Sequence, residues 1–354
     1  MIAILFCVFW AINVILVIIK KKSKLITLLT FAVMVTIYFL NTTSGDYENY
    51  LWEYNTSSYY TVESGFTWIM KIASSCSLSF NQFQGIVCTI SLLLVFYVFK
   101  HYSENYHLFF SVYFIYQYFY DIDSLKNFLA RAILLLAIYM LIEGKRKHFI
   151  FTLLIGLLIH RTLIIYLPLA LFNPERGFSR KSMKYCSIAV VVLCFVIFVL
   201  HSRFEFLGSF LMVALERDNL NAKLNTYLTR STQFGFLIYF VLHACDIFLV
   251  WRSKRFSEFV GEEQTDRLCQ FTWFINLYVV MFFPLIMINN VFFRLFNNII
   301  LLNFILYSRI ADSYEKTTTR YYRYVFVIIL FMLLYRLSFV HSSAELTRIL
   351  GGLL

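Results

Sequence analysis

The feature that most constrains this sequence is a series of long apolar blocks that recurs from one end of the chain to the other. A helix needs about 20 mostly apolar residues to cross a bilayer. Of the 354 residues, 60% are hydrophobic and 14% are charged, against about 45–50% and about 25% in typical globular domains. With 3 prolines and 11 glycines, the composition excludes disordered, collagenous and disulfide-scaffold proteins. We therefore expect a membrane protein.

The blocks predict an all-α, polytopic integral membrane protein that forms a single transmembrane domain over residues 1–354, with about 10–11 transmembrane helices. The segment 149–172 is interrupted by His160 and Arg161. Because basic clusters lie at both of its ends, we expect a re-entrant hairpin there in preference to a full span. The expected spans lie near residues 2–19, 25–40, 83–99, 108–121, 127–142, 185–200, 234–250, 268–288, 291–308 and 324–340.

The basic residues predict the orientation of these spans, because cytoplasmic loops are rich in Lys and Arg. Clusters lie at 20–24, 145–147, 176–184 and 252–255. Placing them inside puts two polar segments, 41–80 and 201–233, on the outer face. The net charge of +11 is thereby mostly explained by topology, and we expect no nucleic-acid partner.

The first outer segment predicts a helix that begins near Asp46, after the turn-forming residues 42–45. Tyr47, Tyr50 and Tyr54 then share one face of that helix, with Asp46 on the adjacent face. Tyrosine rings beside carboxylates would suit a sugar-binding surface. The same rings also fit an interfacial aromatic belt, in which Tyr and Trp are enriched, and the spacing alone favours the belt.

Three further positions are candidates for chemistry. Glu63 precedes an amphipathic stretch on the outer face, and a solvated charge is the alternative interpretation. Arg131, one turn after Asn127, enters a span, where an ionisable residue usually faces a cavity or a partner; the alternative is a side chain that reaches the outer interface. His160 and Arg161 lie within an apolar block, and a hydrogen-bonded core histidine is the alternative for His160.

Arg217 and Arg294 are predicted on the same outer side. Several arginines on one face of a membrane protein suggest a phosphate-bearing ligand, which guanidinium groups bind well. The sequence has no phosphate-binding glycine loop, no nucleophile elbow and no metal-like pairing among its 7 cysteines or its histidines. We therefore expect no cofactor and no metal.

A set of short motifs in fixed order resembles the EpsG family of bacterial membrane proteins, which are similar to the Wzy-type polymerases of O-antigen, capsular polysaccharide and exopolysaccharide. The motifs cover about residues 38–170. At 125–126 the chain has Leu-Lys where such families usually have a polar residue, often glutamine. The motifs are Asn41-Thr with Ser44-Gly-Asp-Tyr-Glu-Asn-Tyr50, Glu63-Ser-Gly-Phe66, Leu78-Ser-Phe80, Asn127-Phe-Leu-Ala-Arg131 and Ile159-His-Arg-Thr-Leu163.

The resemblance implies a GT-C-like membrane glycosyltransferase of the inverting type, on the outer face of the bacterial cytoplasmic membrane. It would join oligosaccharide repeat units carried on undecaprenyl pyrophosphate, among membrane lipid and beside other assembly proteins such as a flippase and a chain-length regulator. Asp46 would be the general base, with Glu63 or His160 as alternatives. Arginines would stabilise the departing pyrophosphate; the candidates are Arg131, Arg161, Arg217 and Arg294.

Two other functions fit a polytopic chain with these residues. A flippase or transporter for lipid-linked oligosaccharides would also need arginines and a polar cavity, but its charges should be spread through many spans. A polytopic polysaccharide acyltransferase could use His160 as a base, but it would need a path for an acyl donor. The concentration of charges in the outer segments favours the polymerase.

Overall fold

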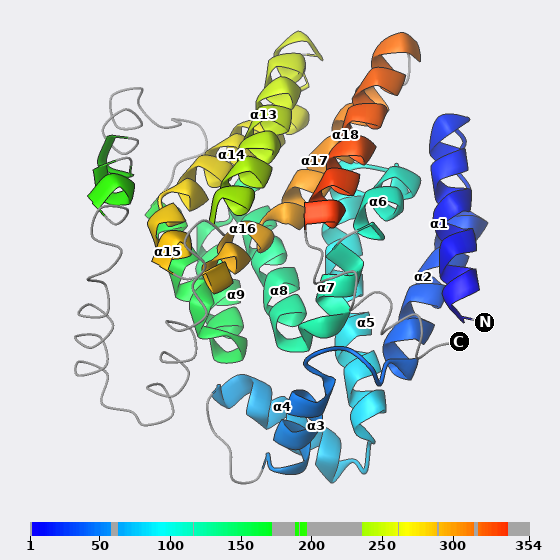
Figure 1. Ribbon diagram of the computed structural model, residues 1–354, viewed down its shortest axis with the longest axis vertical. Helices are drawn as coiled ribbons and strands as arrows, with labels where there is room; N and C mark the ends of the chain where they lie inside the picture. Colours follow the sequence, from blue (N-terminus) through cyan, green and yellow to red (C-terminus); the bar gives the residue numbers. More distant parts are fainter. Residues whose placement is uncertain are drawn as a thin grey trace.

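The computed structural model describes residues 2–57, 63–115, 117–171, 188–190, 192–196, 236–260, 262–288, 290–314 and 318–338. Within these residues every regular element is a helix, as the sequence predicts. Figure 1 shows the long helices packed side by side, with α3 and α4 gathered at one end of the bundle. In the described part of the chain, three helical segments are long and apolar enough to cross a membrane, namely Phe80–Tyr102, Leu125–Ile142 and Phe236–Arg255.

The N-terminal half begins with two shorter apolar helices, and local capping defines several of its helix ends. Ser23 accepts a hydrogen bond from the backbone N–H of Ile26 and starts α2. Ser79 and Gln82 form a reciprocal capping box at the start of α5. The elements are α1 (Ile2–Ile18), α2 (Lys24–Leu40), α3 (Tyr47–Asn55), α4 (Ser64–Ser75), α5 (Phe80–Tyr102), α6 (Tyr106–Tyr113), α7 (Gln117–Asp123), α8 (Leu125–Ile142), α9 (Arg146–Ile159) and the 3₁₀ helix η1 (Arg161–Leu171).

The C-terminal half consists of two long pairs of helices with short elements between them. Pro284 has no N–H to continue the hydrogen-bond ladder of α14, and it lies in the first turn of the next helix instead. The elements are α13 (Phe236–Val260), α14 (Glu263–Val280), α15 (Phe283–Ile288), the 3₁₀ helix η3 (Asn290–Phe293), α16 (Arg294–Asn297), α17 (Ile300–Tyr314) and α18 (Thr318–Ser338).

The structure corrects three of the expected spans. Residues 108–121 form two short helices, α6 and α7, because Gln117 and Asp121 turn inward to a buried hydrogen-bond network. Residues 268–288 are divided between α14 and α15, and residues 291–308 are divided among η3, α16 and α17. Most of the expected span 185–200 and the whole outer segment 201–233 lie outside the described residues.

The predicted interruption at His160 is confirmed. Helix α9 ends at Ile159, and His160 has an extended backbone, with φ −151° and ψ 115°. The chain then continues as the 3₁₀ helix η1. The break turns the His160 side chain out of the regular helix and frees it to contact α4. The re-entrant hairpin itself stays a prediction.

Helix α8 lies at the centre of the N-terminal half. It packs against α5 on one side and α9 on another, and 83% of the residues in its apolar stretch are buried within the protein. Such a helix can carry polar groups only if they are paired. Its charged residues Lys126 and Arg131 both are, as described below.

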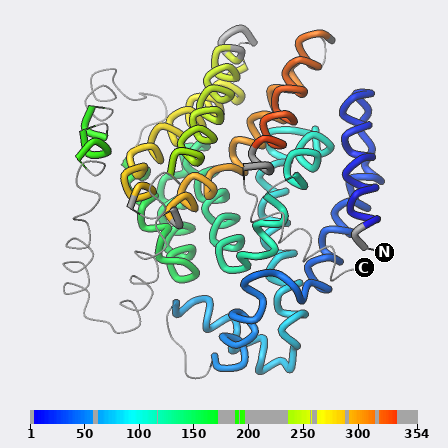
Figure 2. The backbone as a smooth tube through the Cα atoms, viewed as in Figure 1, coloured from blue at the N-terminus to red at the C-terminus, as the bar shows by residue number. Residues whose placement is uncertain are grey.

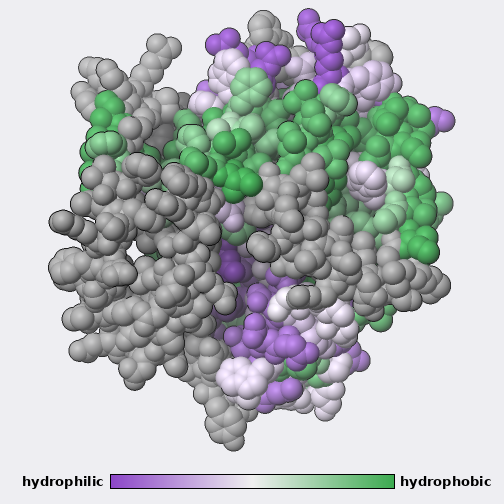
Figure 3. Space-filling view, in the orientation of Figure 1, coloured by the Kyte–Doolittle hydropathy of each residue, from purple (hydrophilic) through white to green (hydrophobic). Residues whose placement is uncertain are grey.

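The two ends of the bundle are chemically different. One end contains the ion pairs of Lys22 with Asp312, His101 with Glu143 and Arg309 with Glu262. The expected basic loops at 20–24 and 145–147 both lie at this end (Figure 1). The other end holds α3, α4 and the break at His160 (Figure 2). On the face drawn in Figure 3, hydrophobic residues form a band with hydrophilic residues above and below it.

Candidate functional site

The predicted helix after the turn at 42–45 is confirmed as α3, with Asp46 at its N-cap position. Its three tyrosines share one face, as the spacing requires, and that face is turned into the protein. Tyr47, Tyr50 and Tyr54 are only 8%, 7% and 6% exposed. The Tyr47 hydroxyl donates to Asn81 Oδ1 at 2.7 Å, and the Tyr54 hydroxyl donates to the Leu78 carbonyl at 2.7 Å.

The tyrosine rings pack on aromatic rings of the neighbouring helices. Tyr47 and Tyr54 contact Phe80 at the start of α5, with ring centroids 5.2 and 5.7 Å apart, and Tyr50 contacts Phe66 of α4 at 6.3 Å. The rings therefore fasten α3 to α4 and α5, and in this conformation they offer no open stacking surface. They position the polar residues at the start of α3.

The break at His160 meets the start of α4 in a compact ionic cluster. His160 Nδ1 lies 2.6 Å from Glu63 Oε1, which also accepts the backbone N–H of Arg161 at 3.3 Å. Lys126 Nζ, from the first turn of α8, lies 2.6 Å from Glu63 Oε2. Glu63 is 8% exposed and His160 17%. We call Glu63, Lys126 and His160 the Glu63 cluster.

Opposing effects act on the Glu63 carboxyl. Burial raises its pKa, whereas the hydrogen bond with His160 and the charge of Lys126 lower it, and the net result is a pKa of about 2. Glu63 is therefore ionised at neutral pH. An ionised carboxylate that accepts from Nδ1–H of a histidine fixes the ring orientation and leaves Nε2 as the proton acceptor.

A second group of polar residues surrounds the N-terminus of α3. Asp123, at the end of α7, accepts the backbone N–H of Asp46 at 3.1 Å through Oδ1. Burial and the neighbouring Asp46 charge raise the pKa of Asp123, while hydrogen bonds from the backbone of Asp46 and Gly45 and the charge of Arg294 lower it, with burial dominating. Burial raises the pKa of the Tyr50 hydroxyl, and the positive charge of Arg294 partly opposes that rise. We call Asp46, Asp123 and Arg294 the Asp46 cluster.

The junction between α7 and α8 joins the two clusters. Asp123 and Lys126 are three residues apart on either side of Ser124, the N-cap position of α8. Asp123 contacts the start of α3, and Lys126 contacts the start of α4. A Cβ at Gly45 would lie 3.0 Å from Asp123 Oδ1, so the glycine allows this close approach. Segments remote in sequence thus converge on one site.

Arg131 lies deeper, fully buried in α8. It pairs with Asp121 of α7 through Nη1, and its guanidinium lies over the ring of Tyr120, 5.1 Å from the centroid. Asp121 also accepts the Tyr113 hydroxyl at 2.6 Å and the Gln117 amide at 2.8 Å. The Nε and Nη2 groups of Arg131 are buried without a hydrogen-bond partner among the described residues. Arg131 therefore has a partner inside the protein and does not reach the interface.

The remaining arginines occupy different surroundings. Arg161 is exposed beside the Glu63 cluster. Arg294 is half-buried at the start of α16 and belongs to the Asp46 cluster. Arg217 lies outside the described residues. The structure thus brings Asp46, Glu63, His160, Arg161 and Arg294 to one end of the bundle.

The sequence interpretation gave no role to three residues that organise this site, namely Asp121, Asp123 and Lys126. Two carboxylates of a polar run before an apolar helix look like capping residues of that helix. Lys126 stood out only as a departure from the family pattern. A lysine in the first turn of a buried helix needs a partner, and that signal could have pointed to Glu63.

Among the described residues, no group of three or more His, Cys, Asp or Glu side chains is placed to hold a metal ion. Comparison with known families gives a match to the model of the EpsG family over residues 23–350. Neither a curated protein nor a solved structure matches the chain. The family match covers both clusters and reaches well beyond the motifs at 38–170.

Proposed function

Because this chain belongs to the EpsG family, a family of Wzy-like polysaccharide polymerases, we propose that it joins lipid-linked oligosaccharide repeat units into a capsular polysaccharide or exopolysaccharide. In this proposal it is a polytopic protein of the bacterial cytoplasmic membrane, its substrate is carried on undecaprenyl pyrophosphate, and the Glu63 and Asp46 clusters lie on the outer face. The observation that carries the proposal is the 2.6 Å contact between Glu63 and His160.

The Glu63 cluster has the parts that a glycosyl transfer requires. A hydroxyl of the acceptor sugar attacks the anomeric carbon of the donor, and its proton passes to Nε2 of His160. Glu63 stabilises the imidazolium that forms, and Lys126 keeps Glu63 ionised. The new bond joins the acceptor oxygen to the anomeric carbon, while the bond from that carbon to the pyrophosphate oxygen breaks. Attack opposite the leaving group inverts the anomeric centre.

The leaving pyrophosphate carries the charge that develops in the transition state. Arg161 follows the proposed base directly in sequence and is exposed, and Arg294 lies at the neighbouring Asp46 cluster. Guanidinium groups held in place before the reaction stabilise such an anion most effectively. We assign Arg161 and Arg294 to the pyrophosphate, and Arg217 stays a candidate for the same role. Arg131, buried against Asp121, is assigned to holding α7 on α8.

Asp46 has a different role in this proposal from the one expected from the sequence. Its side chain is half-exposed, accepts from Asn49 at 3.5 Å and lies beside Asp123. A carboxylate in this position suits hydrogen bonding to sugar hydroxyls. The rings of Tyr47, Tyr50 and Tyr54 pack α3 against α4 and α5 and so position Asp46.

A glycan ladder assay in membranes tests the assignment. His160→Gln removes the basic Nε2 in its required orientation, and we expect polymer formation to fall about 10²–10⁴-fold, the usual contribution of a positioned general base. His148→Gln is the matched control, because His148 is an exposed histidine near the start of the same helix. A normal ladder in His160→Gln, or Asp46→Asn with the larger loss, would move the base to Asp46.

The same strains separate the polymerase from the two alternatives. Loss of a polymerase leaves single lipid-linked units on the outer leaflet, loss of a flippase leaves them on the inner leaflet, and loss of an acyltransferase leaves normal chains without acyl groups. We expect His160→Gln to accumulate single units on the outer leaflet. Accumulation on the inner leaflet would favour the flippase.

A further inference from the structure

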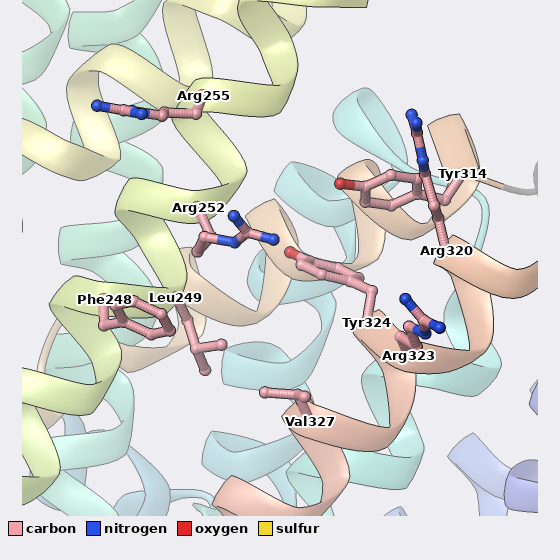
Figure 4. A pocket seen from close by; sticks show the side chains of 9 residues that line it. All are labelled: Phe248, Leu249, Arg252, Arg255, Tyr314, Arg320, Arg323, Tyr324 and Val327. Carbon is pink, nitrogen blue, oxygen red and sulfur yellow. The ribbon is translucent and has the colours of Figure 1, made fainter.

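The end of the bundle opposite the Glu63 cluster contains a cavity of about 860 Å³ between α13 and the α17–α18 pair. Figure 4 shows the residues that line it. Four of the nine are arginines and none is acidic; they are Phe248, Leu249, Arg252, Arg255, Tyr314, Arg320, Arg323, Tyr324 and Val327. We call this cavity the arginine pocket.

The positive charges of the arginine pocket come from two separate helices. Arg252 and Arg255 belong to α13, whereas Arg320 and Arg323 belong to α18. In Figure 4 the Arg252 guanidinium points across the cavity towards the Tyr324 hydroxyl. Arg252, Arg320 and Tyr314 line the same cavity; burial raises the pKa of Tyr314, while the charges of the two arginines lower it. Charges of one sign brought together in this way repel each other.

Among the described residues, no carboxylate forms an ion pair that would offset this repulsion. Three other basic groups at this end are paired with carboxylates: Lys22 contacts Asp312, Arg267 contacts Glu263 and Arg309 contacts Glu262. No ion pair joins any arginine of the pocket to a carboxylate of the described residues. Arg255 instead stacks on Trp251, 4.5 Å from the ring centroid. An anion between α13 and α18 would supply the missing negative charge.

The other wall of the arginine pocket is apolar. Phe248 and Val327 are 54% and 43% exposed, although both are large hydrophobic side chains. They continue along α13 and α18 towards further exposed apolar residues, Phe240 and Leu330 among them. Such a surface faces hydrocarbon at low cost. The pocket therefore combines a cationic rim with an apolar wall that leads into the bilayer.

From this combination we propose that the arginine pocket binds the phosphate group of an anionic phospholipid, whose acyl chains lie along the wall formed by Phe248 and Val327. Basic pockets between helices are suited to lipid headgroups, and guanidinium groups donate two hydrogen bonds to a phosphate. The Tyr324 hydroxyl, 2.8 Å from Ser253 Oγ, fixes one side of the site. The bound lipid would hold α18 against α13. This site is separate from the proposed catalytic end.

Native mass spectrometry of the full chain, released from nanodiscs, measures the lipid that stays bound. We expect phosphatidylglycerol to be retained in preference to phosphatidylcholine. Arg252→Gln/Arg323→Gln should lower the affinity for phosphatidylglycerol roughly 25-fold, at about fivefold for each arginine. Lys145→Gln/Lys147→Gln is the matched control, because it removes two exposed charges from the same end outside the pocket, and it should retain the lipid as the wild type does.

A second variant tests the cavity without removing charge. Val327→Trp fills the apolar side and should reduce retention of phosphatidylglycerol even when thermal unfolding shows that the protein is folded. Equal loss in the lysine control, or equal retention of the two lipids, would overturn the proposal. Binding of inorganic phosphate that displaces the lipid and is insensitive to Val327→Trp would show a soluble-anion site instead. Lipid binding is measured independently of glycan ladders, so failure here leaves the proposed function untouched.

Discussion

The Glu63 and Asp46 clusters at one end of the bundle and the arginine pocket at the other handle charge in opposite ways. At one end, Glu63 and Asp123 each meet groups from other segments, and every contact has a defined geometry. At the other end, the arginines of the arginine pocket converge without a carboxylate among the described residues. The first arrangement is organised in advance, as catalysis requires. The second is the arrangement that the proposed lipid phosphate would complete. The contrast separates a cluster of groups paired across remote segments, where we propose the chemistry, from a group of like charges with no carboxylate ion-pair partner among the described residues, where we propose binding.

The largest effect should follow from removing the Glu63 carboxylate. Glu63→Gln removes the charge that stabilises the protonated His160 and leaves Lys126 without its partner, so we expect polymer synthesis to fall about 10³-fold, in the range for loss of a positioned base or its partner. Initial rates in membrane vesicles provide the measurement.

Glu262→Gln is the control at the opposite end, where Glu262 pairs with Arg309. It also removes one carboxylate from an ion pair, but the rate should stay within about twofold, because exposed pairs contribute little. Similar losses in the two variants would remove the distinction between the ends.

Arg131→Ala should have the next largest effect, and it should act on stability. The variant leaves Asp121 buried without its positive partner, which costs about 3–5 kcal/mol. Arg309→Ala, at the partly exposed pair with Glu262, should cost less than about 1 kcal/mol. Thermal unfolding in detergent compares the two. An Arg131→Ala protein that is as stable as the wild type but inactive would instead indicate that Arg131 binds the pyrophosphate, as the sequence predicts.

Lys126→Met should change how the stability of the protein depends on pH. In the wild type the pKa of Glu63 is lowered from 4.5 to about 2. The ionised carboxylate therefore contributes stability above pH 4.5, and this contribution is lost as the pH falls from about 4.5 towards 2. Without Lys126 the pKa of Glu63 rises, and the acid limb of the stability profile, measured by thermal unfolding at a series of pH values, should move up by roughly one pH unit. Lys147→Met, at an exposed lysine of the other end, should leave that limb in place.

Local signals explain how much of the proposed catalytic end could be predicted. The start of α3 and the shared face of Tyr47, Tyr50 and Tyr54 follow from turn residues and helical spacing, and both are confirmed. The break at His160 follows from a polar pair in an apolar block, and it is confirmed as well. These features depend on residues within a few turns of one another.

Tertiary contacts explain what could not be predicted. His160 meets Glu63 across 97 residues, and no local pattern encodes that distance. The tyrosine face could have met sugar, lipid or protein, because the spacing is the same for all three; the structure shows it packed on α4 and α5. The prediction of a span at 108–121 is wrong because a hydropathy pattern does not register the hydrogen bonds that Asp121 accepts inside the protein.

Two glycines offer the smallest and sharpest comparison between the ends. At the proposed catalytic end, a Cβ on Gly45 would lie 3.0 Å from Asp123 Oδ1, whereas Gly144, in the turn between α8 and α9, has open space but a φ of +73°. Gly45→Ala and Gly144→Ala should each lower the free energy of unfolding by about 1 kcal/mol, the first by crowding and the second by backbone strain.

Their effects on polymer synthesis should differ. Gly45→Ala pushes Asp123 away from the start of α3 and so displaces Asp46, and we expect a rate reduced about threefold, because small displacements of positioned groups slow catalysis. Gly144→Ala touches nothing at the proposed site and should keep the wild-type rate once equal amounts of folded protein are compared. If the two variants lose rate in parallel with stability, Asp46 and Asp123 hold the fold together and take no part in the reaction.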